Sequence, residues 1–318
     1  AVVLIEADDK GVRALTDQGR LPCHGLPTLT RAEERLVCAA LAAGLINPAI
    51  GLGTWYMGEH AAQRQQEVAA LRAGIDHGLT VIDTAEMYAD GGAEEVVGEA
   101  IRGQRERVVL VSKVYPWNAG GRKIASACEA SLRRLNTDYI DLYFSHWPDP
   151  QTPVAETLEA FHSLQQAGKI RATGASNLDA QQLSAALEVA RKEGLPAWQV
   201  LQPEYNLYHR SAFEGALCDL CISREIGVVT YYSLASGFLT GKYRQPSDLA
   251  QSQRGSGIGK YLNPRGMRII DTLEEVAAQH HAKPGEVALA WLMGREGVTA
   301  PIASATSVAQ VESFARAA

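Results

Sequence analysis

The stretch VVLVSKVYPWNAGGRKIASACEASLRRLNTDYIDLYFSH (108–146) predicts a strand, a helix and a second strand in succession. The runs at 108–114 and 139–146 are almost continuously apolar, which is typical of strands covered on both faces. Between them, IASACEASLRRL (124–135) has a helical pattern. A helix that joins two such strands is typical of neighbouring parallel strands, so this stretch predicts a parallel sheet covered by helices.

The same alternation continues along the chain from about residue 48. We predict eight strands, at 49–54, 81–85, 108–114, 139–146, 170–177, 199–205, 227–234 and 299–305. Helical patterns between them include three that close on glycine, at 64–78, 154–168 and 180–194. Eight such units predict an α/β fold, a (β/α)8 TIM barrel that forms a single catalytic domain at 47–318. Residues 1–46 form an N-terminal segment of uncertain structure.

An open, doubly wound sheet is the alternative fold. It should carry a phosphate-binding glycine fingerprint after its first strand. Gly51, Gly53 and Gly58 miss the G-x-G-x-x-G spacing, which favours the barrel.

Composition and charge narrow the class of protein. The chain has 318 residues, 46% of them hydrophobic, and a net charge of −6, so its surface as a whole does not attract nucleic acid or anionic membranes. It has no apolar run of the ~20 residues that a membrane span needs, and its N-terminus lacks the pattern of a signal peptide. We therefore expect a cytoplasmic protein with no nucleic-acid or membrane partner; its oligomeric state is unknown from the sequence.

The cysteines and histidines do not suggest a metal site. Cys218 and Cys221 form a C-x-x-C in an apparently helical stretch, but they supply only two of the four ligands of a structural zinc site. A redox pair is the alternative, and we expect core residues. His280 and His281 are adjacent on a predicted helix and would point apart, so we expect solvated surface and no metal.

Polar residues stand where three successive predicted strands end. Asp83 lies in VIDTAEMY (81–88), Lys113 in the second run and His146 at the end of the third, and Tyr88 follows shortly after Asp83. Because the active sites of such barrels lie at the carboxyl ends of the strands, these side chains should meet in one site. A lysine in a buried strand is costly unless its ammonium is paired. The pattern points to an enzyme.

The four side chains suit reduction of a carbonyl group. We expect Lys113 to lower the pKa of Tyr88 from about 10, which would make the phenol a useful acid–base group. Asp83 would neutralise and orient Lys113, and His146 would donate a hydrogen bond to the substrate oxygen. Taken singly, each residue has a structural interpretation: Asp83 as a helix cap, Tyr88 as a surface aromatic, Lys113 reaching out of the sheet, His146 as a buried structural group. Their combination favours catalysis.

From about Asn47 onward the chain resembles the aldo-keto reductase superfamily. The resemblance is carried by PAIGLGT, VIDTAEMY, VVLVSKV, IDLYFSHWPDP, GKIRATGASN, LQPEYNLYHR, YYSLASGFLTGKY and PIASATS. It looks most like the bacterial branch related to the β subunits of voltage-gated potassium channels. The resemblance implies a (β/α)8 barrel, NADPH as hydride donor, and reduction of aldehydes or ketones to alcohols with the tyrosine as general acid. The family's catalytic tetrad falls on Asp83, Tyr88, Lys113 and His146.

The resemblance also implies cofactor residues. Ser176, Asn177 and Gln202 match the residues that hydrogen-bond the nicotinamide amide, and Tyr231 matches the aromatic residue that stacks on its ring. The segment along the pyrophosphate corresponds to Leu239, Gly241 and Lys242, with Arg244 and Arg254 as further candidates.

The adenosine end departs from many relatives. Ser304 and Gln310 stand where these carry Lys and Arg for the 2′-phosphate, whereas channel-type relatives have Ser and Gln there. We expect NADPH, with NADH possible.

The remaining expectations concern the walls of the site. Trp55, Trp117 and Trp147, with Tyr56 and Met57 as further candidates, should line a substrate pocket for an apolar or aromatic carbonyl compound. The irregular insert at 240–266 is a candidate lid over the cofactor. The C-terminal tail that shapes the pocket in relatives should be short here.

Two other functions stay open. One is a regulatory, channel β-subunit-like protein that binds nicotinamide with little turnover; channel-associated relatives carry asparagine where this chain has His146. The other is a cofactor-free barrel lyase or isomerase.

Overall fold

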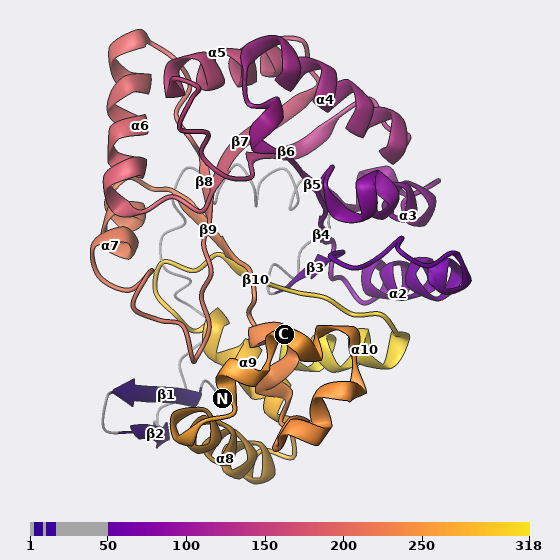
Figure 1. Ribbon diagram of the computed structural model, residues 1–318, viewed down its shortest axis with the longest axis vertical. Helices are drawn as coiled ribbons and strands as arrows, with labels where there is room; N and C mark the ends of the chain where they lie inside the picture. The colour runs from indigo at the N-terminus through magenta and orange to yellow at the C-terminus, as the bar shows by residue number, and fades with distance from the viewer. Residues whose placement is uncertain (1–2, 9–10, 17–49) are drawn as a thin grey trace.

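The computed structural model describes residues 3–8, 11–16 and 50–318. Within the N-terminal part, β1 (Val3–Asp8) and β2 (Gly11–Thr16) pair antiparallel as a separate sheet beside α8 (Figure 1). The rest of the predicted N-terminal segment, with Cys23 and Cys38, lies outside the described residues.

The prediction of a closed parallel barrel is confirmed. The strands pair in the order β10-β3-β4-β5-β6-β7-β8-β9, every neighbouring pair is parallel, and β10 pairs with β3 to close the ring. Each coincides with one predicted strand: β3 Gly51–Gly53, β4 Val81–Asp83, β5 Val109–Val114, β6 Ile140–Ser145, β7 Ile170–Ser176, β8 Val200–Gln202, β9 Gly227–Thr230 and β10 Ala300–Ala303. The open doubly wound sheet is therefore excluded.

Helices cover the outside of this barrel (Figure 1). The helices of the described residues are α2 Arg64–Asp76, α3 Gly92–Ala100, α4 Gly121–Leu135, α5 Val154–Gln166, α6 Ala180–Glu193, α7 Ala216–Ser223, α8 Pro264–Gln279, α9 Pro284–Met293 and α10 Val308–Ala317. The limits of α6 follow from its sequence. The Asp179 side chain accepts a hydrogen bond from the Gln182 backbone N–H, and Gly194 ends the helix with a φ of 65°. No described helix is both long and apolar enough to span a membrane.

Alternate residues of the strands form two hydrophobic layers. Ile82, Leu110 and Leu201 belong to the large cluster between barrel and helices. The residues next to them fill the barrel itself: Val111, Leu142, Phe144, Val200, Val229, Ala300 and Ile302, with Val81 and Ala172 packed against them. This alternation is the period-2 geometry of a strand. Gly174 is needed in the inner layer because a Cβ there would lie 2.4 Å from the Phe144 ring.

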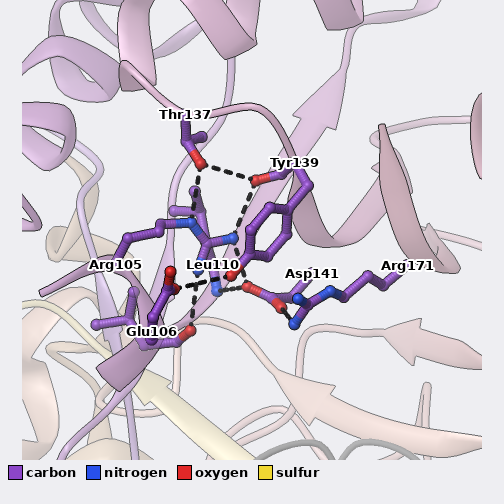
Figure 2. Close-up of polar contacts among 8 residues, drawn as sticks. Arg105, Glu106, Leu110, Thr137, Tyr139, Asp141 and Arg171 are labelled. Carbon is purple, nitrogen blue, oxygen red and sulfur yellow. Dashed lines mark hydrogen bonds and ion pairs between the residues drawn. The ribbon is translucent and has the colours of Figure 1, made fainter. Parts of the chain in front are cut away.

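A polar network joins the start of three strands at the amino-terminal end of the barrel (Figure 2). Asp141 accepts hydrogen bonds from Arg105 (2.7 Å) and the Leu110 backbone N–H (2.9 Å) through one oxygen, and from Arg171 (2.8 Å) through the other. Both guanidinium carbons lie 3.9 Å from the centre of the Tyr139 ring. The network connects β5, β6 and β7 at the end opposite the predicted site, where TIM barrels carry residues that serve stability.

Two smaller predictions concern α7 and the insert. Cys221 is buried and Cys218 half-buried on α7, as expected of core residues. The insert contains three short 3-10 turns before α8 begins: η6 Pro246–Gln251, η7 Gln253–Gly257 and η8 Gly259–Tyr261.

Candidate active site

The strand alternation brings the predicted site residues together. Asp83, Lys113 and Gln202 each stand two positions after an apolar residue of the inner layer, namely Val81, Val111 and Val200. The same step leads from Phe144 to His146 and from Ile302 to Ser304. These polar groups therefore form the next layer, at the carboxyl ends of the strands.

Asp83 and Lys113 form a buried ion pair. Lys113 Nζ donates to Asp83 Oδ1 at 2.6 Å and to the Thr84 carbonyl at 2.9 Å, and it lies 3.5 Å from the Tyr88 hydroxyl. Lys113 is fully buried and Asp83 nearly so. Burial lowers the pKa of Lys113, while Asp83 opposes this change. The sequence predicted that a lysine in a buried strand must be paired, and Asp83 is its partner.

The expectation that Lys113 lowers the pKa of Tyr88 is wrong for this structure. Burial raises the pKa of Tyr88 well above 10, and the charge of Asp83 raises it further. The physical reason is that burial disfavours the charged phenolate more than any neighbouring cation stabilises it; Arg254 lowers the pKa, but by less than burial and Asp83 raise it. Tyr88 is therefore a fully protonated phenol near neutral pH, a form suited to donating a proton.

His146 stands beside Tyr88 as a neutral imidazole. Its ring meets that of Tyr88 edge-on, with 5.8 Å between centroids, and stacks on Trp147 at 4.0 Å. Burial, with a smaller contribution from Lys113, lowers the pKa of His146 to about 2. Its Nδ1 is buried without a hydrogen-bond partner among the described residues. One ring nitrogen of the neutral form can therefore donate and the other accept.

The predicted nicotinamide residues form one connected group. Ser176 Oγ donates to the Gln202 carbonyl (2.7 Å), and Asn177 Nδ2 donates to the His146 carbonyl (2.9 Å). Tyr231 donates its hydroxyl hydrogen to Asn177 Oδ1 at 2.7 Å. Asn177 has a φ of 59°, a left-handed conformation that asparagine tolerates better than most residues. The ends of β7, β8 and β9 are thus joined at one side of the site.

A cavity of about 850 Å³ opens at this end of the barrel. Thirteen of the sixteen predicted site residues lie in the wall of this cavity or directly behind it. Lys113 lies beneath the lining, and twelve others line the cavity: Asp83, Tyr88, His146, Ser176, Asn177, Gln202, Tyr231, Lys242, Ser304, Gln310, Trp55 and Trp147. The additional candidates Tyr56 and Arg254 line it too.

Other predicted residues lie away from the cavity. Leu239 is buried in the core and Gly241 is outside the lining. Trp117 is 68% exposed and packs on Tyr115 outside the lining. Arg244 pairs with Asp271 and Glu274. Met57, a possible substrate contact, is buried in the core.

Sequence reasoning missed several lining residues. Tyr232 packs on Trp55, with 5.4 Å between ring centroids, and Lys283 adds a cation to the lining. Tyr232 follows the predicted Tyr231 directly in the sequence, so its position next to an expected cofactor residue could have identified it. Lys283 belongs to a turn before α9, and no strand pattern led to it.

The insert contributes Arg254 to the same cavity. Arg254 Nη2 donates to the Trp55 carbonyl at 3.1 Å, and its guanidinium lies 5.4 Å from the centre of the Tyr56 ring. Burial lowers the pKa of Arg254. Through this contact the insert touches the loop after β3 at the cavity wall.

This fold and site define a barrel oxidoreductase. Residues 49–318 match the aldo/keto reductase family, and the chain belongs to that family.

Known proteins similar to the chain bear this out. It is 46% identical over 265 residues to methylglyoxal reductase YeaE of Escherichia coli (strain K12), which covers 83% of each chain. It is 31% identical over 285 residues to a probable voltage-gated potassium channel subunit beta of Arabidopsis thaliana, covering 85% of this chain and 87% of the plant protein. Among solved structures, an aldo/keto reductase from Klebsiella pneumoniae in complex with NADP and acetate shares 48% identity over 85% of each chain, with a TM-score of 0.71.

Proposed function

We propose that this protein catalyses the NADPH-dependent reduction of an aldehyde or ketone to an alcohol, with Tyr88 as the general acid. The observation that carries the proposal is the Tyr88 hydroxyl, 3.5 Å from Lys113 Nζ and beside the His146 ring, in a cavity of about 850 Å³. This volume is near the upper end for small-molecule sites, which suits a dinucleotide together with a substrate.

The chain's own residues manage the proton. NADPH, when bound, supplies the hydride for the carbonyl carbon. Tyr88 gives its hydroxyl hydrogen to the carbonyl oxygen as negative charge develops there. An alkoxide is a stronger base than a phenolate, so this transfer is favourable despite the high pKa of Tyr88.

The neighbours of Tyr88 support the transfer. The Lys113 ammonium lies close enough to stabilise the phenolate that remains, and Asp83 keeps that ammonium charged in a buried position. Neutral His146 donates a hydrogen bond to the substrate oxygen and so holds it near Tyr88.

The residues present fit the cofactor. Ser176, Asn177 and Gln202 offer hydroxyl and amide groups for the nicotinamide amide, and Tyr231 offers a ring beside them. Lys242 and Lys283 line the cavity and suit phosphate groups. The NADP complex of the Klebsiella pneumoniae relative supports the choice of NADP(H). Ser304 and Gln310, which are uncharged, leave NADH as the weaker alternative.

The substrate side of the cavity is aromatic. Trp55 stacks on Tyr56 with 4.6 Å between ring centroids, and Trp147 stacks on His146. These walls suit a small or aromatic carbonyl compound. Because a relative is a methylglyoxal reductase, methylglyoxal and nitrobenzaldehyde are the first compounds to test.

The test is steady-state reduction of these compounds with NADPH and, separately, with NADH. We expect turnover with a higher kcat/KM for NADPH. Fluorescence titration would measure cofactor binding in parallel. Tight binding of NADPH with negligible turnover of any aldehyde would reject the reductase.

A second candidate is a redox-sensing regulatory subunit. The likeness to a plant protein described as a probable channel subunit favours it. Two results together would support this function: tight binding of NADPH without its oxidation by any aldehyde, and co-purification of a membrane protein.

A further inference from the structure

Gln202 makes a contact that its expected role toward the nicotinamide does not require. Its side-chain Nε2 donates to Asp83 Oδ2 at 2.9 Å, while Lys113 Nζ donates to the other oxygen of the same carboxylate. Gln202 is 2% exposed. Because an ionised carboxylate only accepts hydrogen bonds, this contact also fixes the orientation of the Gln202 amide, with Oε1 directed away from Asp83.

The contact spans the barrel. In the closed order of strands, β8 stands four positions from β4 in either direction, so Gln202 reaches Asp83 from the opposite side. Strand pairing alone could not bring these two side chains together. The main-chain carbonyl of Gln202 also accepts the hydrogen of Ser176 Oγ. One residue therefore touches both the expected nicotinamide group and the catalytic ion pair.

We propose that Gln202 is a positioning residue that holds Asp83 from across the barrel and so couples the nicotinamide subsite to the proton relay of Asp83, Lys113 and Tyr88. The inference rests on the proposed function and deepens it. With Nε2 on Asp83, the carbonyl oxygen of the amide is the group left for a nicotinamide N–H donor. A single amide thus aligns cofactor and carboxylate.

The electrostatic consequence has a definite sign. The Gln202 N–H dipole offsets part of the negative charge of Asp83, and that charge raises the pKa of Tyr88. Loss of the amide should therefore raise the pKa of Tyr88 further. The other charged or titratable groups that act on Tyr88 or Lys113 come from several elements and are unchanged by this substitution: Glu94, His146, Tyr231, Tyr232 and Arg254.

The experiment measures alcohol oxidation with NADP⁺ as a function of pH. In this direction Tyr88 acts as the base, so the rate rises as its hydroxyl ionises. In Gln202→Leu the rising limb should move to higher pH by ~0.5–1 unit. This is a part of the ~1–2 units that one hydrogen bond to a charged group is worth, because Gln202 bonds to Asp83 and acts on Tyr88 only through it. Gln202→Met, which is longer and flexible, replaces this variant if it fails to fold. Gln199→Leu, on the same segment but bonded to the Thr173 backbone N–H, should leave the limb in place.

A second arm isolates the contact with Asp83. In an Asp83→Asn background, the additional Gln202→Leu change should shift the limb no further. An unmoved limb in Gln202→Leu, or an equal shift in both backgrounds, would overturn the inference. Wild-type turnover is measured first, so an inactive wild type counts against the proposed function, whereas an active wild type with an unmoved limb in the variant counts against Gln202 alone.

Discussion

At the scale of single residues, the proposed mechanism makes the half-buried Tyr88 an acid whose pKa is raised, not lowered, by its surroundings. Lys113 is near, but its charge is largely compensated by Asp83 at 2.6 Å. The phenol therefore keeps its proton over the neutral range and releases it only when a stronger base forms next to it. A raised pKa keeps the phenol protonated at neutral pH, so the reverse reaction, in which Tyr88 would act as the base, should require alkaline conditions.

Replacing Tyr88 by phenylalanine tests this role. We expect Tyr88→Phe to lower kcat for aldehyde reduction by ~10²–10⁴-fold, because general acid catalysis is lost, while NADPH affinity stays near that of the wild type. The matched control is Tyr139→Phe, which removes a hydroxyl bonded to Glu106 at the opposite end of the barrel. Retained turnover in Tyr88→Phe would contradict the assignment.

His146 makes a prediction about stability and pH. Its pKa is about 2 in the folded protein, against an ordinary 6.5, so below pH 6.5 the unfolded chain binds a proton that the folded chain does not. Stability therefore falls as pH decreases through this window, by up to about 1.4 kcal/mol per pH unit from this group.

Urea denaturation at pH 7, 6 and 5 measures the effect. The loss of stability with falling pH should be smaller in His146→Asn than in the wild type, since asparagine does not titrate. His280→Asn, at an exposed position, should follow the wild type. Parallel curves for wild type and His146→Asn would show that the histidine is not held neutral.

At the scale of elements, the insert before α8 combines two arginines with different surroundings. Arg254 is directed to the cavity and touches the loop after β3, whereas Arg244 is paired with two carboxylates on α8. The path of the chain through the turns η6 to η8 gives the two arginines their different surroundings. The composition of the insert does not reveal this difference.

We expect Arg254→Met to weaken NADPH binding by ~10–100-fold, because a half-buried guanidinium lining the cavity can make a charge-assisted contact with a phosphate. Fluorescence titration with NADPH measures this. Arg244→Met should bind as the wild type does. Equal affinities in the two variants would remove the insert from the cofactor site.

At the scale of the whole molecule, the two ends of the barrel differ in structure: one is open to a cavity and the other is closed by an ion-pair network. The carboxyl end holds the cavity, and the amino end is tied by Asp141, Arg105 and Arg171 around Tyr139 (Figure 2). The inner apolar layer lies between them. Changes at the amino end should therefore alter the stability of the fold and leave the chemistry of the cavity unchanged.

Asp141→Asn should lower the free energy of unfolding by ~2–4 kcal/mol, because it leaves the mostly buried Arg105 without its counter-charge. The KM for the carbonyl substrate should not change at temperatures where the variant is folded. Urea denaturation and steady-state kinetics measure the two quantities. Glu188→Gln, which breaks an exposed ion pair with Arg191, should leave the midpoint near that of the wild type. A large change in KM in Asp141→Asn would contradict this separation of stability from chemistry.

The sequence alone determined the barrel and pointed to most of the predicted residues that line its cavity. Local pattern was sufficient for the barrel and for the polar strand ends: eight apolar runs separated by helices allow few arrangements, and period-2 alternation places Asp83, Lys113 and His146 on the inner face, each two positions after a residue that belongs to the inner layer or packs against it. The resemblance then pointed to Ser304 and Gln310, and both line the cavity.

Only the tertiary structure decided how these groups act on one another. The high pKa of Tyr88 depends on its burial and on the nearby charge of Asp83. The contact of Gln202 with Asp83 joins residues 119 positions apart on opposite strands, and Trp117 points outward despite its place after a strand. Local pattern carries no information on such quantities, because burial and charge–charge distances are set by closing the barrel, which brings remote strand ends within hydrogen-bonding range.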